Sequence, residues 1–152
     1  MRDLCPVKKP LPLHYLALFL SLVFISSGPQ QVSVEVVSST TGGELYLAAY
    51  DSADAFESEE HVSNARQALS ENAQTAELEL RVPAAGHYVV AAFQDMNGNG
   101  KLDRNFFGVP TEPYGFAKLP PSKWRAPDYD EIKTRIDGPD RLTIELKHWN
   151  EY

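Results

Sequence analysis

The chain has 152 residues, of which 21 are acidic and 14 are basic, so its formal net charge is −7 at pH 7. This length suits a single domain that buries its own core. The negative charge argues against a nucleic acid partner, because proteins bind nucleic acid through basic surfaces.

The N-terminal segment has the pattern of a secretory signal. The basic residues Arg2, Lys8 and Lys9 precede an apolar run at residues 15–25, and the small residues 26–28 follow it. The apolar run is short for a membrane-spanning helix, which needs roughly 20 residues. We therefore predict a cleavable signal peptide, with an uncleaved membrane anchor as the alternative.

This signal would cover residues 1–28 and leave one domain over residues 29–152. The only cysteine, Cys5, lies in the signal. The exported domain would then contain no disulfide and no thiol chemistry. We expect it in the periplasm, at the outer membrane or outside the cell, with no membrane span once the signal is removed.

The first part of the domain alternates with period two, which is typical of half-buried strands. Val32, Val34 and Val36 alternate with polar neighbours. A turn at residues 41–43 leads into a second alternating run at residues 44–50, where Leu45, Leu47 and Ala49 share one face. The pattern predicts a hairpin of these two strands.

Residues 51–74 are polar, and we interpret them as a loop with a short helix around residues 64–70. Alternation resumes at residues 76–82 and predicts another strand. After a turn at residues 83–86, the run at residues 88–93 is apolar on both faces. That pattern predicts a strand in the centre of a sheet.

A glycine- and proline-rich stretch follows at residues 95–127, and a last alternating strand is expected at residues 142–146. Several short strands separated by turns favour an all-β fold, an antiparallel β-sandwich. A loop as long as residues 95–127 is uncommon in a compact domain unless it has a function or is held in place.

The start of this loop places side-chain oxygens two residues apart around a glycine, as calcium loops do. Loop positions 1, 3, 5, 6, 7 and 9 are occupied by Asp95, Asn97, Asn99, Gly100, Lys101 and Asp103. The first, third, fifth and ninth supply side-chain oxygens, the seventh a backbone carbonyl, and the glycine allows the sharp turn. The pattern predicts a calcium site.

The calcium pattern is incomplete, because Phe106 stands at position 12, where an EF-hand has a bidentate Glu. Glu112 is the nearest candidate for the missing ligand, and Asp128 or Asp130 is the next. With two neutral amides among the ligands, we expect a dissociation constant of about 10⁻⁴ to 10⁻³ M. The alternative interpretation is that the Asn-Gly pairs are tight turns that bind nothing.

Aromatic residues gather in the same loop and just after it, and they are Phe106, Phe107, Tyr114, Phe116, Trp124 and Tyr129. One interpretation is a small core that anchors the loop to the sandwich. The other is an exposed platform that stacks on a sugar or peptide. Tyr114 and Trp124 are the best candidates for that role, because each ring combines an apolar body with a polar group.

The loop also carries a family resemblance. The run at residues 92–103 reads AFQDMNGNGKLD, and it is continued by Asn105, Phe106, Gly108, Val109, Pro110, Glu112, Tyr114, Gly115 and Phe116. This order resembles the signature of the DUF2141 family, which consists of small exported bacterial proteins of unknown function. Gln94 and Pro113 depart from the pattern, where His and Gly are expected. The resemblance implies a transthyretin-like or carboxypeptidase-regulatory-like β-sandwich and export, and it implies no activity.

We therefore predict an exported, monomeric, calcium-stabilised β-sandwich that acts as a binding or structural module in the bacterial cell envelope. Its partner would be a cell-surface glycan or peptide. No motif for a nucleophile or general base is present, so we expect no enzymatic activity and no catalytic residues.

Two alternatives remain open. One is a hydrolase or isomerase of small envelope metabolites that uses an acidic cluster drawn from Asp95, Asp103, Glu112, Asp128 and Asp130. The other is an ion-free structural sandwich that binds a partner strand at an exposed sheet edge.

Overall fold

The computed structural model describes residues 28–152. The predicted signal peptide, apart from Gly28, lies outside the described residues. Within the described part of the chain, no helix is long and apolar enough to cross a membrane.

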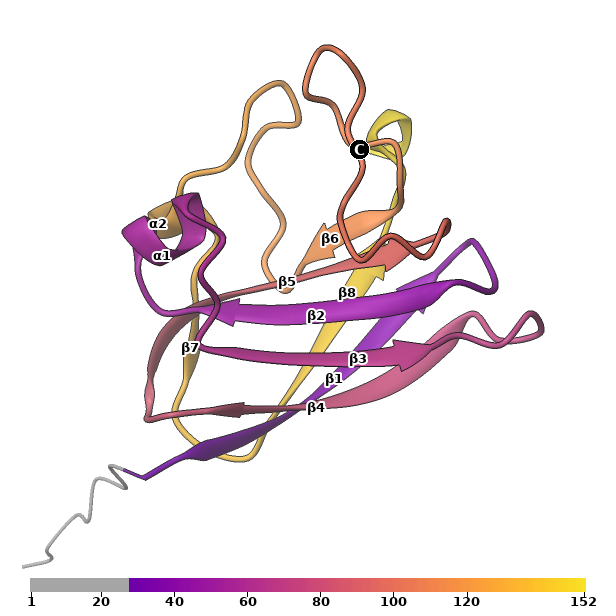
Figure 1. Cartoon of the computed structure of the whole chain (residues 1–152). Coiled ribbons are helices and arrows are strands. Elements are labelled where there is room, and N and C mark those ends of the chain that lie inside the picture. Colours follow the sequence, from indigo (N-terminus) through magenta and orange to yellow (C-terminus); the bar gives the residue numbers. More distant parts are fainter. Residues whose placement is uncertain (1–27) are drawn as a thin grey trace, which may run out of the picture.

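The described chain forms two packed β-sheets with short helices at their ends (Figure 1). The elements in chain order are β1 (Gln30–Ser38), β2 (Glu44–Tyr50), α1 (Ala53–Glu57), β3 (Ser63–Ala68), β4 (Thr75–Val82), β5 (Gly86–Asp95), β6 (Tyr114–Phe116), α2 (Tyr129–Ile132), β7 (Thr134–Ile136), β8 (Asp140–Leu146) and the 3-10 helix η1 (Trp149–Glu151). One sheet has the strand order β4-β1-β8 and the other β3-β2-β5-β6, with β7 paired to β5. The predicted all-β sandwich is confirmed.

The core lies between the inner faces of the two sheets. The period-two pattern of the sequence sets those faces: alternate residues of β1 and β4 are buried, and their neighbours are more exposed. The valines at 32, 34 and 36 meet Leu45, Leu47 and Leu80 in one apolar cluster. Every second side chain therefore contributes to the hydrophobic driving force, as expected for strands with one buried face.

The expected hairpin of β1 and β2 is wrong. β1 pairs with β4 in antiparallel register and with β8 in parallel register, whereas β2 pairs with β3 and β5. The residues between β1 and β2 cross from one sheet to the other, and buried Gln94 holds this crossing. Its side-chain amide donates to the carbonyl oxygens of Thr40 and Gly42, and it accepts from the Ser38 hydroxyl at 2.6 Å.

The expected helix around residues 64–70 is also wrong, because most of that segment is strand β3, paired along β2. The helix in this region is α1, which lies earlier in the chain. Its N-cap is Ser52, whose hydroxyl accepts the Ala55 N–H. Pairing with β2 outweighs the weak helical preference of the β3 sequence.

β5 is central, as predicted, with β2 on one side and β6 and β7 on the other. β6 lies inside the long loop expected at residues 95–127 and brings that loop back onto the sheet. Gly115 in β6 has no room for a side chain, because a Cβ there would collide with the Glu145 backbone oxygen. Tyr114 and Lys147 exchange two backbone hydrogen bonds at the same place.

These contacts bring the edges of the two sheets together. β6 lies beside β8 on one side of the sandwich, and β3 lies beside β4 on the other. The Arg81 N–H donates to the Ser63 hydroxyl across the second junction. The two edges of the five-stranded sheet are therefore covered by the other sheet, and the outer face of the five-stranded sheet remains for the loops after β5 and β6.

Candidate functional site

The loop after β5 is built around the carboxylate of Asp95, which is 1% exposed. Its Oδ1 accepts the backbone N–H groups of Asn97 at 3.2 Å, Gly98 at 2.7 Å and Asn99 at 3.3 Å. Its Oδ2 accepts the Gly100 N–H at 2.6 Å. The last strand residue thereby folds the next five residues around its own side chain.

These hydrogen bonds decide the charge state of Asp95. Burial alone would raise the pKa of this carboxyl, because a charged group is poorly solvated in the protein. The four backbone N–H donors outweigh that effect, and the pKa of Asp95 lies below its ordinary value of 3.8. Asp95 is therefore ionised at neutral pH, with its charge compensated by peptide dipoles.

A second buried carboxylate, Glu112, closes the other end of the loop and is 5% exposed. Its Oε1 accepts the Met96 N–H at 2.8 Å, and its Oε2 accepts the Asp103 N–H at 3.1 Å. The residue before it, Thr111, donates its N–H to the Asp103 carbonyl. Glu112 thus fastens two points of the loop to the segment that enters β6, a structural role that the sequence analysis did not assign to it.

The remaining polar side chains of the loop contact one another. The side-chain amides of Asn97 and Asn99 donate to the Asp103 carboxylate. The Asn97 Oδ1 accepts the Asn99 N–H at 3.0 Å, and the Asn99 Oδ1 accepts the Lys101 N–H at 2.8 Å. The five predicted ligands from Asp95 to Asp103 therefore lie in one hydrogen-bonded network.

This network fits a calcium ion in part. The available donors are hard oxygens, which suit calcium, and a carboxylate oxygen that accepts one N–H keeps a free lone pair. However, within residues 28–152 no group of three or more His, Cys, Asp or Glu side chains is arranged to hold a metal. A calcium site here would combine the two carboxylates of Asp95 and Asp103 with neutral oxygens.

A cleft of about 1740 Å³ lies over the outer face of the five-stranded sheet and borders the loop network at Gly100 and Lys101. Aromatic rings form much of its lining: Tyr46 and Tyr50 from β2, Phe56 from α1, Phe93 from β5, Tyr114 and Phe116 from β6, and Phe107, Trp124, Tyr129 and Trp149 from the segments around it. The Tyr46 and Phe93 rings stack with centroids 4.9 Å apart. Phe56 meets Phe116 edge to face at 6.4 Å.

Tyr114, one of the two predicted ligand-binding residues, lies in the floor of this cleft. Its ring stacks on Tyr152 at 5.0 Å, and the Tyr152 hydroxyl donates to the Tyr114 carbonyl at 2.7 Å. Burial raises the pKa of both tyrosines above the ordinary value. Both phenols therefore stay protonated near neutral pH.

Trp124, the other predicted residue, lies at the mouth of the cleft and is 78% exposed. Its ring packs edge to face on Trp149 at 5.4 Å, and the Lys123 Nζ lies over both rings. Its backbone N–H donates to the Ser122 hydroxyl. Tyr114 and Trp124 therefore line the same cleft at different depths.

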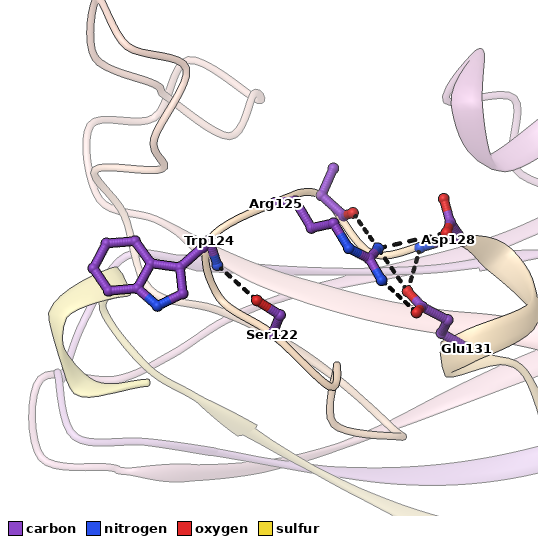
Figure 2. Close-up of polar contacts among 6 residues, drawn as sticks. Ser122, Trp124, Arg125, Asp128 and Glu131 are labelled. Carbon is purple, nitrogen blue, oxygen red and sulfur yellow. Dashed lines mark hydrogen bonds and ion pairs between the residues drawn. The ribbon is translucent and has the colours of Figure 1, made fainter.

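An arginine holds the segment that carries Trp124. Figure 2 shows Arg125 reaching toward α2, where its guanidinium pairs with Glu131 and Asp128, while the Trp124 indole points the other way. The guanidinium donates to the Glu131 carboxylate. This bond raises the pKa of Arg125 and lowers the pKa of Glu131. The segment before α2 is thus tied at one end by Arg125, and the Trp124 side chain stays exposed.

Most of the cleft floor was not predicted from the sequence. Tyr46 and Tyr50 come from β2, whose core face was predicted, and Phe93 comes from β5, which was predicted to be apolar on both faces. The three rings line the cleft on the outer face of the sheet. The alternation in β2 contained the signal, because Tyr46 and Tyr50 lie on the face opposite to Leu45, Leu47 and Ala49. Aromatic residues on an expected solvent face indicate a covered or binding surface.

The carboxylates that were considered for an acid-base pair make different contacts in the structure. Asp95 and Glu112 accept backbone hydrogen bonds inside the loop. Asp128 and Asp130 line the cleft, but Asp128 belongs to the cap of α2 and pairs with Arg125, and Asp130 pairs with Lys133. The geometry of these groups supports ordering of loops and helix ends more than hydrolysis.

Comparison with known proteins gives one result. Residues 32–144 match the model of a family described as an uncharacterized protein conserved in bacteria, DUF2141. The matched region runs from β1 into β8 and includes the whole loop network and the cleft floor. No curated protein and no solved structure matches the chain.

The loop network predicts a strong asymmetry between its two aspartates. Asp95→Ala should lower the free energy of unfolding by about 2–4 kcal/mol, because four backbone N–H groups lose a charged acceptor. Asp103→Ala should cost less than about 1 kcal/mol, because its carboxylate accepts only from side-chain amides. Urea unfolding without calcium measures both, with exposed Asp54→Ala as control. Equal decreases in the free energy of unfolding for the two variants would contradict the conclusion that Asp95 organises the loop.

Proposed function

Because the chain belongs to the DUF2141 family, whose description assigns no activity, we propose a function from its geometry: an exported binding module that holds an elongated ligand in the aromatic cleft. The cleft over the outer face of the five-stranded sheet supports this proposal. The loop between β5 and β6 provides one wall, and the segment before α2 provides another. Export follows from the signal pattern of residues 1–28 and remains part of the proposal.

The size of the cleft points to a chain-like ligand. Pockets for drug-sized molecules enclose about 300–1,000 Å³, whereas this cleft encloses about 1740 Å³. A single small metabolite would leave much of the aromatic floor in contact with water. An oligomeric ligand could cover Tyr46, Phe93 and Tyr114 together.

The lining favours a glycan over a peptide strand. Sugar rings have apolar C–H faces that pack on aromatic rings and hydroxyl groups that require polar partners. Polar side chains along β3 and its approach, Asn64, Arg66 and His61, line the same cleft. A peptide added as a strand would need an open sheet edge, but β3 lies beside β4 and β6 lies beside β8. We therefore assign a cell-surface glycan as the ligand class.

Calcium fits this proposal as a second support for the loop wall. Asp95, Asn97, Asn99 and Asp103 would hold the ion, together with the Lys101 carbonyl. When bound, calcium would supply positive charge between the two aspartates. Glu112 would keep its hydrogen bonds to the Met96 and Asp103 N–H groups. The loop is thus ordered by its own hydrogen bonds, and bound calcium would stabilise it further.

Binding of oligosaccharides tests the proposed function. We expect a short linear oligosaccharide, drawn from cellulose, chitin and peptidoglycan fragments, to shift the NMR signals of the Tyr46 and Phe93 rings. Trp124→Ala should weaken that binding by roughly tenfold, because it removes one stacking face. Phe106→Ala is the matched control, because Phe106 is an exposed aromatic residue outside the cleft lining. The proposal fails if no sugar shifts the ring signals or if both variants bind equally weakly.

Calcium binding is a separate prediction. Calorimetric titration should give a dissociation constant of about 10⁻⁴ to 10⁻³ M, and millimolar calcium should raise the melting temperature. Asp103→Ala should abolish this response while leaving stability without calcium nearly unchanged. Glu112→Gln should leave the calcium affinity within about threefold while lowering stability, because one of its two backbone hydrogen bonds is lost. An unchanged melting curve at millimolar calcium would reduce the loop to hydrogen bonding alone.

A further inference from the structure

The most exposed large apolar side chains of residues 28–152 are concentrated in two loops. Phe106 is 97% exposed, Phe107 84%, Trp124 78% and Leu119 61%. The first two lie in the loop between β5 and β6, and the others lie in the segment between β6 and α2. In Figure 1 both loops, drawn in orange, rise from the same side of the sandwich. Exposed aromatic groups gathered in this way mark an interaction surface.

The tip of the first loop is a rigid turn that displays its two phenylalanines. Arg104 and Pro110 form an antiparallel bridge, and the Gly108 N–H donates to the Asn105 carbonyl at 2.9 Å, closing a β-turn. The Asn105 side chain accepts the Phe107 N–H at 2.9 Å and the Val109 N–H at 3.1 Å. Phe106 and Phe107 therefore occupy the two central positions of the turn.

Those positions normally carry small or polar residues, because a turn apex projects into water. Two phenylalanines there gain no core burial and add apolar surface to water. Their rings meet edge to face at 5.6 Å, so the pair forms one apolar knob. A sequence that breaks a local rule without a structural gain at that place indicates a function there.

The two loops that carry these aromatic residues contain more basic than acidic residues, in contrast to the whole chain. Residues 101–125 contain the five basic residues Lys101, Arg104, Lys118, Lys123 and Arg125 and the two acidic residues Asp103 and Glu112. Glu112 is buried, and Asp103 is engaged by the amides of Asn97 and Asn99. Arg104 and Arg125 pair with Glu59 and Glu131, whereas Lys118 is exposed. The two arginines are therefore compensated, and the positive charge that pairs with no Asp or Glu side chain of residues 28–152 comes from Lys101, Lys118 and Lys123, on a chain of net charge −7.

We propose that these two loops dock on a membrane surface that carries anionic headgroups. The phenylalanine knob and Trp124 enter the interfacial region, where aromatic side chains are favoured, and the basic side chains meet the headgroup charge. A second copy of the chain fits less well, because it would bring Lys101, Lys118 and Lys123 close to the same lysines of the other copy. This docking surface shares Phe107 and Trp124 with the lining of the glycan cleft and extends beyond it through Phe106 and Leu119.

The test uses the full chain with Trp149→Phe, which leaves Trp124 as its single tryptophan. Vesicles of phosphatidylcholine, with or without phosphatidylglycerol, carry a spin-labelled lipid that quenches nearby indole fluorescence. In Figure 1 β1 begins on the side of the sandwich away from the two loops. Vesicle binding through the chain before β1 is distinguished from docking of the loops by comparing Trp124 quenching with and without Phe106 and Phe107. The readout therefore reports on the loops.

We expect quenching of Trp124 with the anionic vesicles, weaker quenching with the neutral ones, and a loss of quenching at high salt. Phe106→Ser with Phe107→Ser should lower the apparent affinity for anionic vesicles by at least about tenfold. Val62→Ser, an exposed apolar residue outside the two loops, serves as the control and should leave it unchanged.

Two results would overturn the proposal. One is the absence of quenching, or equal quenching in the double phenylalanine variant. The other is a dimer that forms without vesicles and disappears in that variant, which would make a second copy of the chain the occupant of this surface.

Discussion

The buried carboxylate of Asp95 is the constraint on which the functional side of the molecule depends. It ends the central strand β5, and its two oxygens accept four backbone N–H groups of the residues that follow. A charged acceptor inside the fold is costly unless it is fully hydrogen-bonded. That requirement fixes the path of the chain as it leaves the sheet, and Glu112 repeats the arrangement where the chain returns to β6. Between these two carboxylates the chain is free to carry residues that the core does not need.

The two carboxylates thereby connect the fold with both proposed activities. The cleft floor is a property of the sheet, because Tyr46, Phe93 and Tyr114 lie on the outer faces of β2, β5 and β6. The cleft walls and the exposed tips are properties of the loops, which the carboxylates and the pairing of Arg125 with Glu131 hold in place. A glycan in the cleft and a membrane at the loop tips would contact neighbouring surfaces. The same ordered loops would therefore serve both.

The sequence predicted local structure better than long-range pairing. Period-two alternation predicted β1, β2, β4 and β8, and the run that is apolar on both faces predicted β5 as a central strand. Both patterns depend only on which side chains of a single strand are buried, so the sequence of that strand is enough to show them. The pairing of the strands was predicted wrongly, because β1 pairs with β8 in parallel register and does not form a hairpin with β2. The crossing from β1 to β2 is accompanied by buried hydrogen bonds of Gln94 with Thr40 and Gly42, which join residues distant in sequence. The ligand spacing selected residues that lie in one hydrogen-bonded network, and whether they bind calcium stays a prediction. Spacing cannot show that Glu112 accepts backbone N–H groups, and the sequence of a turn with Phe106 and Phe107 does not show that both rings are exposed.

The central claim is that the ionised Asp95 carboxylate organises the loop, and its titration tests this most directly. NMR would follow the Asp95 carboxyl carbon and the amide protons of Gly98 and Gly100 as the pH is lowered. Since the folded pKa lies below the ordinary 3.8, its contribution to stability is fully present above that value and is lost as the pH falls through the folded pKa. We predict that Asp95 titrates below 3.8 and that both amide protons lose protection at the same midpoint. A carboxyl that titrates at or above 3.8, or amide protons that stay protected after it is protonated, would contradict the account.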